Sequence, residues 1–566
     1  IKLFQYSIIQ IDCPPSKRIC LETTTDLTPE NIRYSDVGIE EFLDFDGIGF
    51  SGKIKERWED FIVNEVDINN RVIYLNNTDL PASKNSHIYT ENKHLSESIN
   101  NDLNELSSNH AKNEVVFEAP ENKTIRTEIY SFLKSKYPTL YGNTEVRDSK
   151  RVFVVTNYED ERSQIAKKIS KTSGDDDYCQ FVMYKEGKDT ISAISLIAKY
   201  LKMKPGIFTY AGTKDRRGIT SQLIRVRSCA ANRLKGLNKC LKGIVLGNFS
   251  YEHTPLKLGD LYGNRFRLVV RDVKASDEDI EQAMNRFTNG FINYFGMQRF
   301  GSTEIRSHEI GKLAIASKWE EMIKLILEPT PQDLPFMRDC KTKFKNTQNI
   351  EEFLQASANG IERSIVSGLS KHGYSLNALD SLPRNLRQLY VHSYQSYVWN
   401  KIVSKRIREC GSNVVMEGDL VETGDQNIIT LNKSNLDKYS ITDVILPLPG
   451  YDVMLPENKI SEWYRDILAQ DSLTMESLRH KVKEFSLPGS YRKLVVVPEN
   501  LQYSIHKYND ATIPLIESDD HLLKKDFVLP KSEGSLKAVL LEFTLAKSAY
   551  ATIAMRELMK TVTVIQ

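Results

Sequence analysis

The chain has 566 residues, of which 40% are hydrophobic and 27% charged, and its formal net charge is +1. This composition is typical of a globular protein of several domains and excludes a low-complexity or disordered chain. No apolar run is long enough to cross a bilayer, which excludes a membrane-spanning helix. The seven cysteines are scattered without Cys-x-x-Cys spacing, so we expect reduced thiols and no zinc site.

Residues 1–71 are predicted to contain short strands or turns followed by a strand over residues 61–66, where β-branched and aromatic residues predominate. Lys55 and Phe61 lie just before that strand and at its start. Residues 72–176 are rich in Asn, Ser, Lys and Glu and form a polar insertion. A helical pattern and a strand pattern near its end predict a small folded unit inside this insertion.

Residues 177–305 return to an ordered pattern of strands and helices. A strand over 180–184 is followed by a helix that Asp189 or Thr190 can cap and that Pro205 ends. The next strand leads into a loop in which Asp215 stands between Lys214 and two arginines, Arg216 and Arg217. Neighbouring cations favour an ionised carboxylate. The loop is either a charged surface turn or a site for a polyanion.

Positive charge is concentrated around this loop. Residues 199–271 contain 16 Lys and Arg against 3 Asp and Glu, a local charge of +13 in a chain whose total is +1. This distribution favours a nucleic-acid surface, although a solvated basic face has the same composition. The candidate RNA-backbone residues are Arg216, Arg217, Arg225, Arg227, Arg265 and Arg267.

The segment 263–273 alternates basic and apolar residues and predicts a strand with one wet, cationic side. Ser276 and Asp279 form a plausible capping pair for the next helix. That helix runs into residues 293–301, which combine two amides, three aromatic rings and an arginine. Such a mixture suits an unpaired base. A helix end filled with aromatic core residues is the alternative.

Residues 306–485 are predicted to be mainly helical, with one long helix over 385–410 that carries an aromatic stripe. A stripe at helical spacing is more often core than ligand platform. Residues 486–566 are predicted to supply strands over 494–497 and 538–545 and a final amphipathic helix.

Four stretches, in order along the chain, resemble the signatures of the TruD family of pseudouridine synthases. They are residues 59–65, 211–222, 293–301 and 550–558. The chain departs from the bacterial pattern at Trp58, where a proline is usual, and at Tyr550, where a phenylalanine is usual. The insertions at 72–176 and about 503–533 resemble those of the eukaryotic branch.

The resemblance implies an α+β fold: a bipartite catalytic domain on a mixed, mostly antiparallel sheet, with an inserted α/β TRUD domain at 306–485 and smaller eukaryotic insertions. The catalytic parts are then 1–71, 177–305 and 486–566. Asp215 matches the family's catalytic aspartate. The matching pocket and active-site positions are Lys55, Phe61, Lys214, Asn293, Phe295 and Tyr550.

The implied function is isomerisation of uridine to pseudouridine in RNA, with no metal or other cofactor. The expected substrate is position 13 in the D-arm of tRNA, with small nuclear and messenger RNAs carrying a U-x-U-A-purine context as further candidates. The expected enzyme is a monomer without membrane association, in the nucleus with some cytoplasmic presence. The alternatives are a non-catalytic RNA-binding protein on the same fold and a hydrolase that uses Asp215 as nucleophile.

Overall fold

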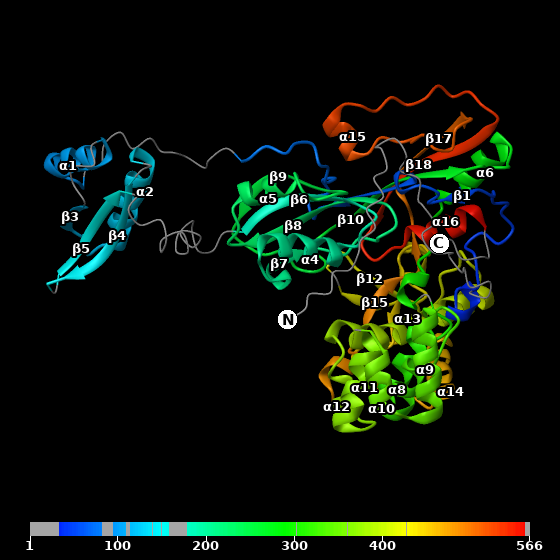
Figure 1. Ribbon diagram of the computed structural model, residues 1–566. Helices are drawn as coiled ribbons and strands as arrows, with labels where there is room; N and C mark the ends of the chain where they lie inside the picture. Colours follow the sequence, from blue (N-terminus) through cyan, green and yellow to red (C-terminus); the bar gives the residue numbers. More distant parts are fainter. Residues whose placement is uncertain are drawn as a thin grey trace. The chain divides into compact units, whose positions relative to one another are not determined.

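The computed structural model describes residues 33–81, 94–108, 114–137, 140–148, 150–157, 178–301, 303–358, 360–425 and 427–560 (Figure 1). The chain forms two compact units. Unit 1 comprises Ile1–Val72, Arg216–Thr220 and Leu261–Gln566. Unit 2 comprises Ile73–Asp215 and Ser221–Asp260. The five-part division expected from the sequence stays a prediction.

The main sheet of unit 1 has the strand order β17-β18-β10-β2, and β1 pairs with β10. All four pairings are antiparallel. β2 has the predicted bounds, and both of its faces are buried. The strands are β1 (Lys53–Ile54), β2 (Phe61–Val66), β10 (Gly263–Arg271), β17 (Glu499–Tyr508) and β18 (Leu536–Ala546).

Two helices pack against this sheet and against each other, α6 (Asp277–Phe287) and α16 (Ala551–Met559) (Figure 1). The predicted capping pair is confirmed: the Ser276 hydroxyl accepts from the backbone N–H of Asp279, and the Asp279 carboxylate accepts from that of Ser276. The buried side of α6 places Phe287 against Phe543 of β18. The same unit contains the short helix α15 (Asp519–Lys524).

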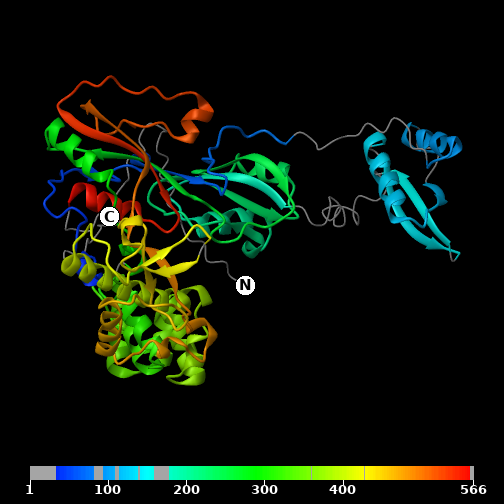
Figure 2. The ribbon, with the colours of Figure 1, turned by 180° about the vertical axis from the view of Figure 1, so that it is seen from behind.

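The rest of unit 1 is mainly helical, as predicted for 306–485, and Figure 2 shows the helices gathered in one bundle. The long helix α13 begins after Pro383 and ends before Gly411, whose φ of +88° favours glycine. The helices are α7 (Ser307–Ile315), α8 (Trp319–Ile326), α9 (Pro335–Thr347), α10 (Ile350–Ala356), α11 (Ile361–His372), α12 (Leu376–Leu379), α13 (Arg384–Cys410) and α14 (Ile460–Gln470).

Two small antiparallel sheets accompany this bundle. One pairs β11 (Phe291–Ile292) with β16 (Val495–Val496), so the predicted strand 494–497 is confirmed over two residues. The other has the order β13-β12-β14-β15. Its strands are β12 (Leu420–Glu422), β13 (Ile428–Thr430), β14 (Val444–Leu448) and β15 (Ser490–Lys493).

Unit 2 contains the strands on which the Asp215 loop is built. β6 pairs with β9, and β7 pairs with β8, both antiparallel. Helix α4 begins after Asp189, whose carboxylate accepts from the N–H of Ser192, as the sequence predicted. The elements are β6 (Tyr178–Glu186), α4 (Thr190–Leu201), β7 (Phe208–Tyr210), β8 (Ile219–Arg227), α5 (Ala231–Leu237) and β9 (Ile244–Glu252).

The polar insertion of unit 2 contains the small folded unit that was predicted. Its antiparallel sheet has the order β3-β5-β4. Phe132 and Phe153 are fully buried in a core of its own. The elements are α1 (Glu97–Ser108), β3 (Glu114–Glu118), α2 (Lys123–Lys136), β4 (Leu140–Arg147) and β5 (Lys150–Asn157).

Candidate active site

The loop that carries Asp215 connects β7 to β8. Asp215 is the last residue of this stretch in unit 2, and Arg216 is the first of five residues that belong to unit 1. Asp215, Arg216 and Arg217 are exposed, whereas the preceding Lys214 is buried. The loop therefore offers a carboxylate and two guanidinium groups to solvent.

Three buried polar side chains of unit 2 bind the backbone of this loop. The Lys185 ammonium donates to the carbonyls of Asp215, at 3.0 Å, and Lys214, at 3.4 Å. Thr190 accepts from the N–H of Lys214 at 2.8 Å and donates to Gln222, which in turn donates to the carbonyl of Gly212. All three side chains are fully buried, so they hold the loop's backbone in a defined position.

The sequence predicted no part in holding this loop for any of the three, although Thr190 was a candidate cap of α4 beside Asp189. The only available signal was their polarity within otherwise apolar strands and a helix start. Burial lowers the pKa of Lys185 to about 8, although the negative charges of Asp215 and Asp189 favour its protonated form. Burying an ammonium is costly, and here two of its hydrogen bonds go to the backbone carbonyls of the loop.

Unit 1 brings together Asn293, Phe295 and Tyr550 around one buried arginine, Arg492 of β15. The Arg492 guanidinium lies 4.1 Å from the centre of the Phe295 ring and 6.0 Å from that of Tyr550. Phe295 and Tyr550 meet edge to face, with ring centres 6.3 Å apart. Three segments that are distant in sequence therefore form one aromatic cluster.

Arg492 also fixes the Asn293 amide. Its guanidinium donates to the side-chain oxygen and the backbone carbonyl of Asn293, and to the carbonyls of Tyr294 and Ser548. The Asn293 amide nitrogen donates to the carbonyl of Lys493 at 3.1 Å. Burial lowers the pKa of Arg492 to about 10. One lone pair and one N–H of the amide remain for another partner.

Helix α13 packs against the same cluster. Asn400 accepts from the N–H of Phe295 at 2.9 Å and donates to its carbonyl at 3.2 Å. Trp399 is fully buried and meets the Phe295 ring edge to face at 5.6 Å. The predicted core role of the α13 stripe is confirmed at Trp399, and that core positions Phe295. Gly296 leaves room for Tyr550, since a β-carbon there would lie 2.9 Å from its ring.

Lys55 and Phe61 form a second pair in unit 1. The Lys55 ammonium lies 4.2 Å from the centre of the Phe61 ring, and both residues are buried. Gly218, the glycine that closes the aspartate loop, has a φ of +145°. A β-carbon there would lie 2.5 Å from the carbonyl oxygen of Phe61. Only glycine fits this approach.

The prediction that one side of β10 is solvent-exposed and cationic is wrong. The fully buried Arg271 pairs with Asp60 at 2.8 Å, and Arg267 pairs with Asp519 of α15 at 3.2 Å. Arg265 pairs with Glu542 of β18. Acids from β18, from α15 and from the turn before β2 lie beside these arginines, so most of their charge is neutralised inside unit 1. Their role in phosphate binding stays a prediction.

The two arginines of β8 differ. Arg225 donates to the side chain of Gln180 at 2.8 Å and to the carbonyl of Thr254 at 2.8 Å, and it lies 3.8 Å from Glu252. Arg227 is exposed at the end of the strand. The Arg227 guanidinium is therefore more accessible to a polyanion than the Arg225 guanidinium.

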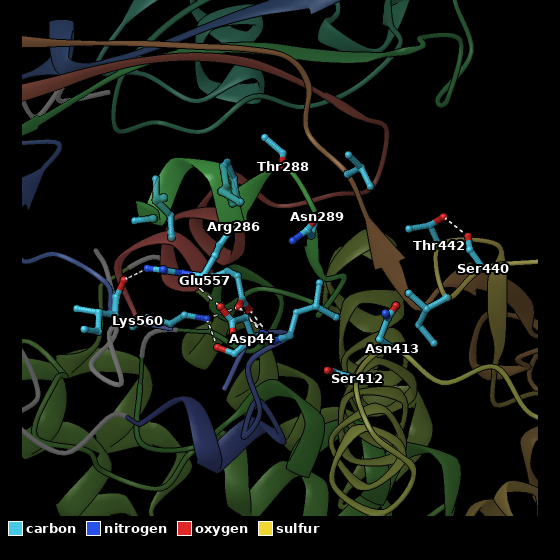
Figure 3. A pocket seen from close by; sticks show the side chains of 18 residues that line it. Asp44, Arg286, Thr288, Asn289, Ser412, Asn413, Ser440, Thr442, Glu557 and Lys560 are labelled. Atoms are coloured by element: carbon cyan, nitrogen blue, oxygen red, sulfur yellow. Dashed lines mark hydrogen bonds and ion pairs between the residues drawn. The ribbon is translucent and has the colours of Figure 1, made fainter. Parts of the chain in front are cut away.

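A cavity of about 570 Å³ lies in unit 1 and is lined by none of the residues predicted for the site (Figure 3). The charged residues on one side of the cavity pair with each other, since Arg286 pairs with Asp44 and Lys560 with Glu557. Its other side carries small polar residues, among them Asn289, Ser412, Asn413, Ser440 and Thr442.

The residues that the structure describes contain no cluster of His, Cys, Asp or Glu suited to a metal ion. Within the same residues, no helix is long and apolar enough to cross a membrane.

Comparison with known proteins places this geometry in a family. The family model of tRNA pseudouridine synthase D (TruD) matches residues 142–558. Pseudouridylate synthase 7 homolog of Homo sapiens is 39% identical over 555 residues, which cover 95% of this chain and 83% of the relative. Multisubstrate pseudouridine synthase 7 of Schizosaccharomyces pombe is 32% identical over 617 residues, covering 94% of this chain and 90% of the relative.

A crystal structure assigned to tRNA pseudouridine synthase D of Methanosarcina mazei has a TM-score of 0.56 and 21% identity to this chain, and the match covers 93% of this chain and 97% of that one. This likeness confirms the predicted α+β fold with a mostly antiparallel mixed sheet. The family model and the two relatives show that the chain belongs to the TruD family of pseudouridine synthases, in its eukaryotic branch, and is an RNA pseudouridine synthase.

Proposed function

We propose that this synthase isomerises the uridine at position 13 in the D-arm of tRNA and also uridines in other RNAs with a U-x-U-A-purine context, including small nuclear and messenger RNAs. Two findings support this choice. The matching family model is named for a tRNA pseudouridine synthase. The relative in Schizosaccharomyces pombe is named a multisubstrate enzyme.

Asp215 is proposed as the catalytic carboxylate. The observation that carries this assignment is an exposed acid on a loop whose backbone is bound by the buried Lys185, Thr190 and Gln222. A carboxylate on a rigid support can meet a sugar in a defined orientation. A loose surface turn would not need three buried polar supports, each of which is costly to bury.

Two routes are open to an ionised Asp215. In one, a carboxylate oxygen attacks C1′ as the N1–C1′ bond breaks, which gives a glycosyl ester that C5 of the turned base later displaces. In the other, the carboxylate takes the C2′ proton, and the base leaves as a C1′=C2′ double bond forms. C5 of the turned base then attacks C1′ while the protonated carboxyl returns the proton to C2′. In both, C5 loses its proton after the C5–C1′ bond forms, and N1 gains one.

The aromatic cluster of unit 1 is proposed to bind the uracil ring. The target base must leave its stack, which costs a few kcal/mol. Stacking of the base on an aromatic side chain contributes about 1–3 kcal/mol to binding and offsets that cost. Phe295, Tyr550 and Phe61 are candidate stacking surfaces, and the fixed Asn293 amide is a candidate partner for the base edge. Lys55 and Lys214 are proposed to favour the ionised form of Asp215.

The substrate proposal is tested with purified protein, an unmodified tRNA transcript and no added cofactor. The predicted product is a mass-silent isomer at position 13, detected by carbodiimide labelling and primer extension. A matched transcript with cytidine at position 13 should stay unlabelled there. Labelling elsewhere in the D-arm, or none at all, would contradict the tRNA assignment. Release of free uracil would instead indicate the hydrolase.

The proposal also covers which RNAs are modified in the cell and where the protein is located. Transcriptome-wide pseudouridine mapping with and without the protein should show loss at U-x-U-A-purine sites, and loss at unrelated sequences would contradict the context. We also propose a monomer located in the nucleus with some cytoplasmic presence. Light scattering and imaging of the tagged protein test these two points.

A further inference from the structure

Lys185 is a buried cation in β6, a strand whose other buried side chains are mostly apolar. Its side chain has no solvent exposure, and it lies on β6 between Tyr184 and Glu186. Its ammonium donates to three backbone carbonyls, those of Lys188, Lys214 and Asp215. An ammonium removed from water must regain its hydrogen bonds, so these carbonyls are what holds the charge in place.

Two of those acceptors belong to the aspartate loop: the carbonyl of Lys214 and the carbonyl of Asp215 itself. The carboxylate of Asp215 also favours the charged form of Lys185, so the ammonium lies within the electrostatic reach of that carboxylate. Thr190 and Gln222 hold the same loop with neutral groups. Of the three supports, Lys185 alone brings a positive charge.

We propose that Lys185 is a positioning residue for Asp215: it fixes the backbone of the catalytic aspartate and places a positive charge within electrostatic reach of the carboxylate. This inference rests on the proposed role of Asp215. Both routes need that carboxylate ionised at the start. In the ester route the carboxylate also leaves C1′ when C5 attacks, and a nearby ammonium favours the departing anion.

The variants are Lys185→Met, which keeps the length and removes the donors, and Lys185→Arg, which keeps the charge. Lys318→Met, an exposed lysine before α8, is the control. We expect Lys185→Met to lower the single-turnover rate at saturating tRNA about a hundredfold, the cost of a small misplacement at a reacting centre. Its tRNA affinity should stay within about twofold of the unchanged protein, since the buried side chain reaches no RNA.

A purely structural role would give a different result. The folded fraction of Lys185→Met would then fall, as urea unfolding would show, while the rate per folded enzyme stayed within about threefold of the unchanged protein. That outcome would overturn the inference. A hundredfold loss with partial recovery in Lys185→Arg would support it.

A pH profile decides the question even if Lys185→Met does not fold. The charged groups that act on Lys185 are Asp215, Asp189 and Lys214. Because its pKa is lowered to about 8, the single-turnover rate of the unchanged protein should fall as pH rises from 7 to 9, while the Arg variant should keep its rate. A flat profile for the unchanged protein would overturn the inference.

Asp215→Asn separates this inference from the function on which it rests. An inactive Asp215→Asn with a fully active Lys185→Met removes the role of Lys185 and leaves the role of Asp215 intact. An active Asp215→Asn removes both.

Discussion

The guanidinium of Arg492 donates to the amide oxygen of Asn293 at 2.7 Å and to the backbone carbonyl of the same residue at 2.8 Å. The two residues are separated by 199 positions in the chain. One buried cation thereby sets the orientation of an amide that is proposed to meet the base, and its flat face supports the ring of Phe295.

Arg492→Met should lower kcat/KM at least about tenfold and reduce the free energy of unfolding by about 3 kcal/mol. The carbonyls of the buried residues Asn293 and Tyr294 each lose a donor, and an unsatisfied buried polar group costs about 1–3 kcal/mol. Single-turnover kinetics and urea unfolding measure the two effects.

Arg479→Met is the matched control for that experiment. Its guanidinium lies 4.1 Å from the centre of the Tyr451 ring, the same distance as Arg492 to Phe295, but the residue is exposed. An exposed cation–π contact contributes about 0.5–1 kcal/mol, so activity should not change. Equal losses in both variants would contradict the role assigned to Arg492.

Exchange of Arg216 and Arg217 for alanine should weaken tRNA binding and reduce its salt dependence. Each lost phosphate contact lowers the slope of log K against log salt by about 0.7–0.9. Both guanidinium groups are exposed, so we expect the slope to fall by about 1 to 2. Binding titrations between low and moderate salt measure it.

Arg267→Ala tests whether a paired arginine contributes to the same slope. Its guanidinium pairs with Asp519 and donates to the carbonyl of Glu517, so the variant should lose stability and keep the salt slope. A slope as shallow as that of the Arg216 and Arg217 variant would place the RNA along β10 after all.

Arg271→Met should be strongly destabilising. Arg271 and Asp60 are fully buried, and removal of one partner leaves the other charge unpaired in the core at a cost of about 3–5 kcal/mol. Lys274→Met removes an exposed lysine that pairs with Asp272 and should cost less than about 1 kcal/mol. Urea unfolding of both variants gives the comparison, and equal costs would show that the buried pair is not needed.

His308 should make the stability of unit 1 depend on pH. Burial lowers its pKa to about 4, against about 6.5 in an unfolded chain. Between those values the unfolded chain binds more protons, so stability falls as pH drops from 6.5 to 4. His308→Phe, which can keep the stack on Tyr397, should reduce this loss by up to about 3 kcal/mol.

Above pH 7 the ring is neutral in both states, so His308→Phe and the unchanged protein should there show the same dependence on pH. If the slope between pH 6.5 and 4 is also the same, another group carries the acid sensitivity.

Local signals in the sequence predicted much of the fold. β-branched and aromatic residues marked β2 at its observed bounds, and Asp189, Ser276 and Gly411 marked helix ends. These features depend on residues within one turn or one strand. The loop of Asp215 was found for the same reason, since its cations and glycines are neighbours in the chain.

Contacts between distant segments were not predictable in this way. The acids that neutralise β10 lie on β18, on α15 and before β2, so the alternating arginines gave a wrong expectation of a wet face. Arg492 and Lys185 carry no local motif for their roles, because each acts on residues of another strand or loop.

The most direct measurement is pseudouridine formation by Asp215→Asn on a tRNA transcript under single-turnover conditions. We expect no detectable isomerisation, while the tRNA affinity and the urea concentration at the unfolding midpoint stay within about twofold of those of the unchanged protein. Isomerisation at an undiminished rate by this variant would contradict the assignment of Asp215 as the catalytic carboxylate.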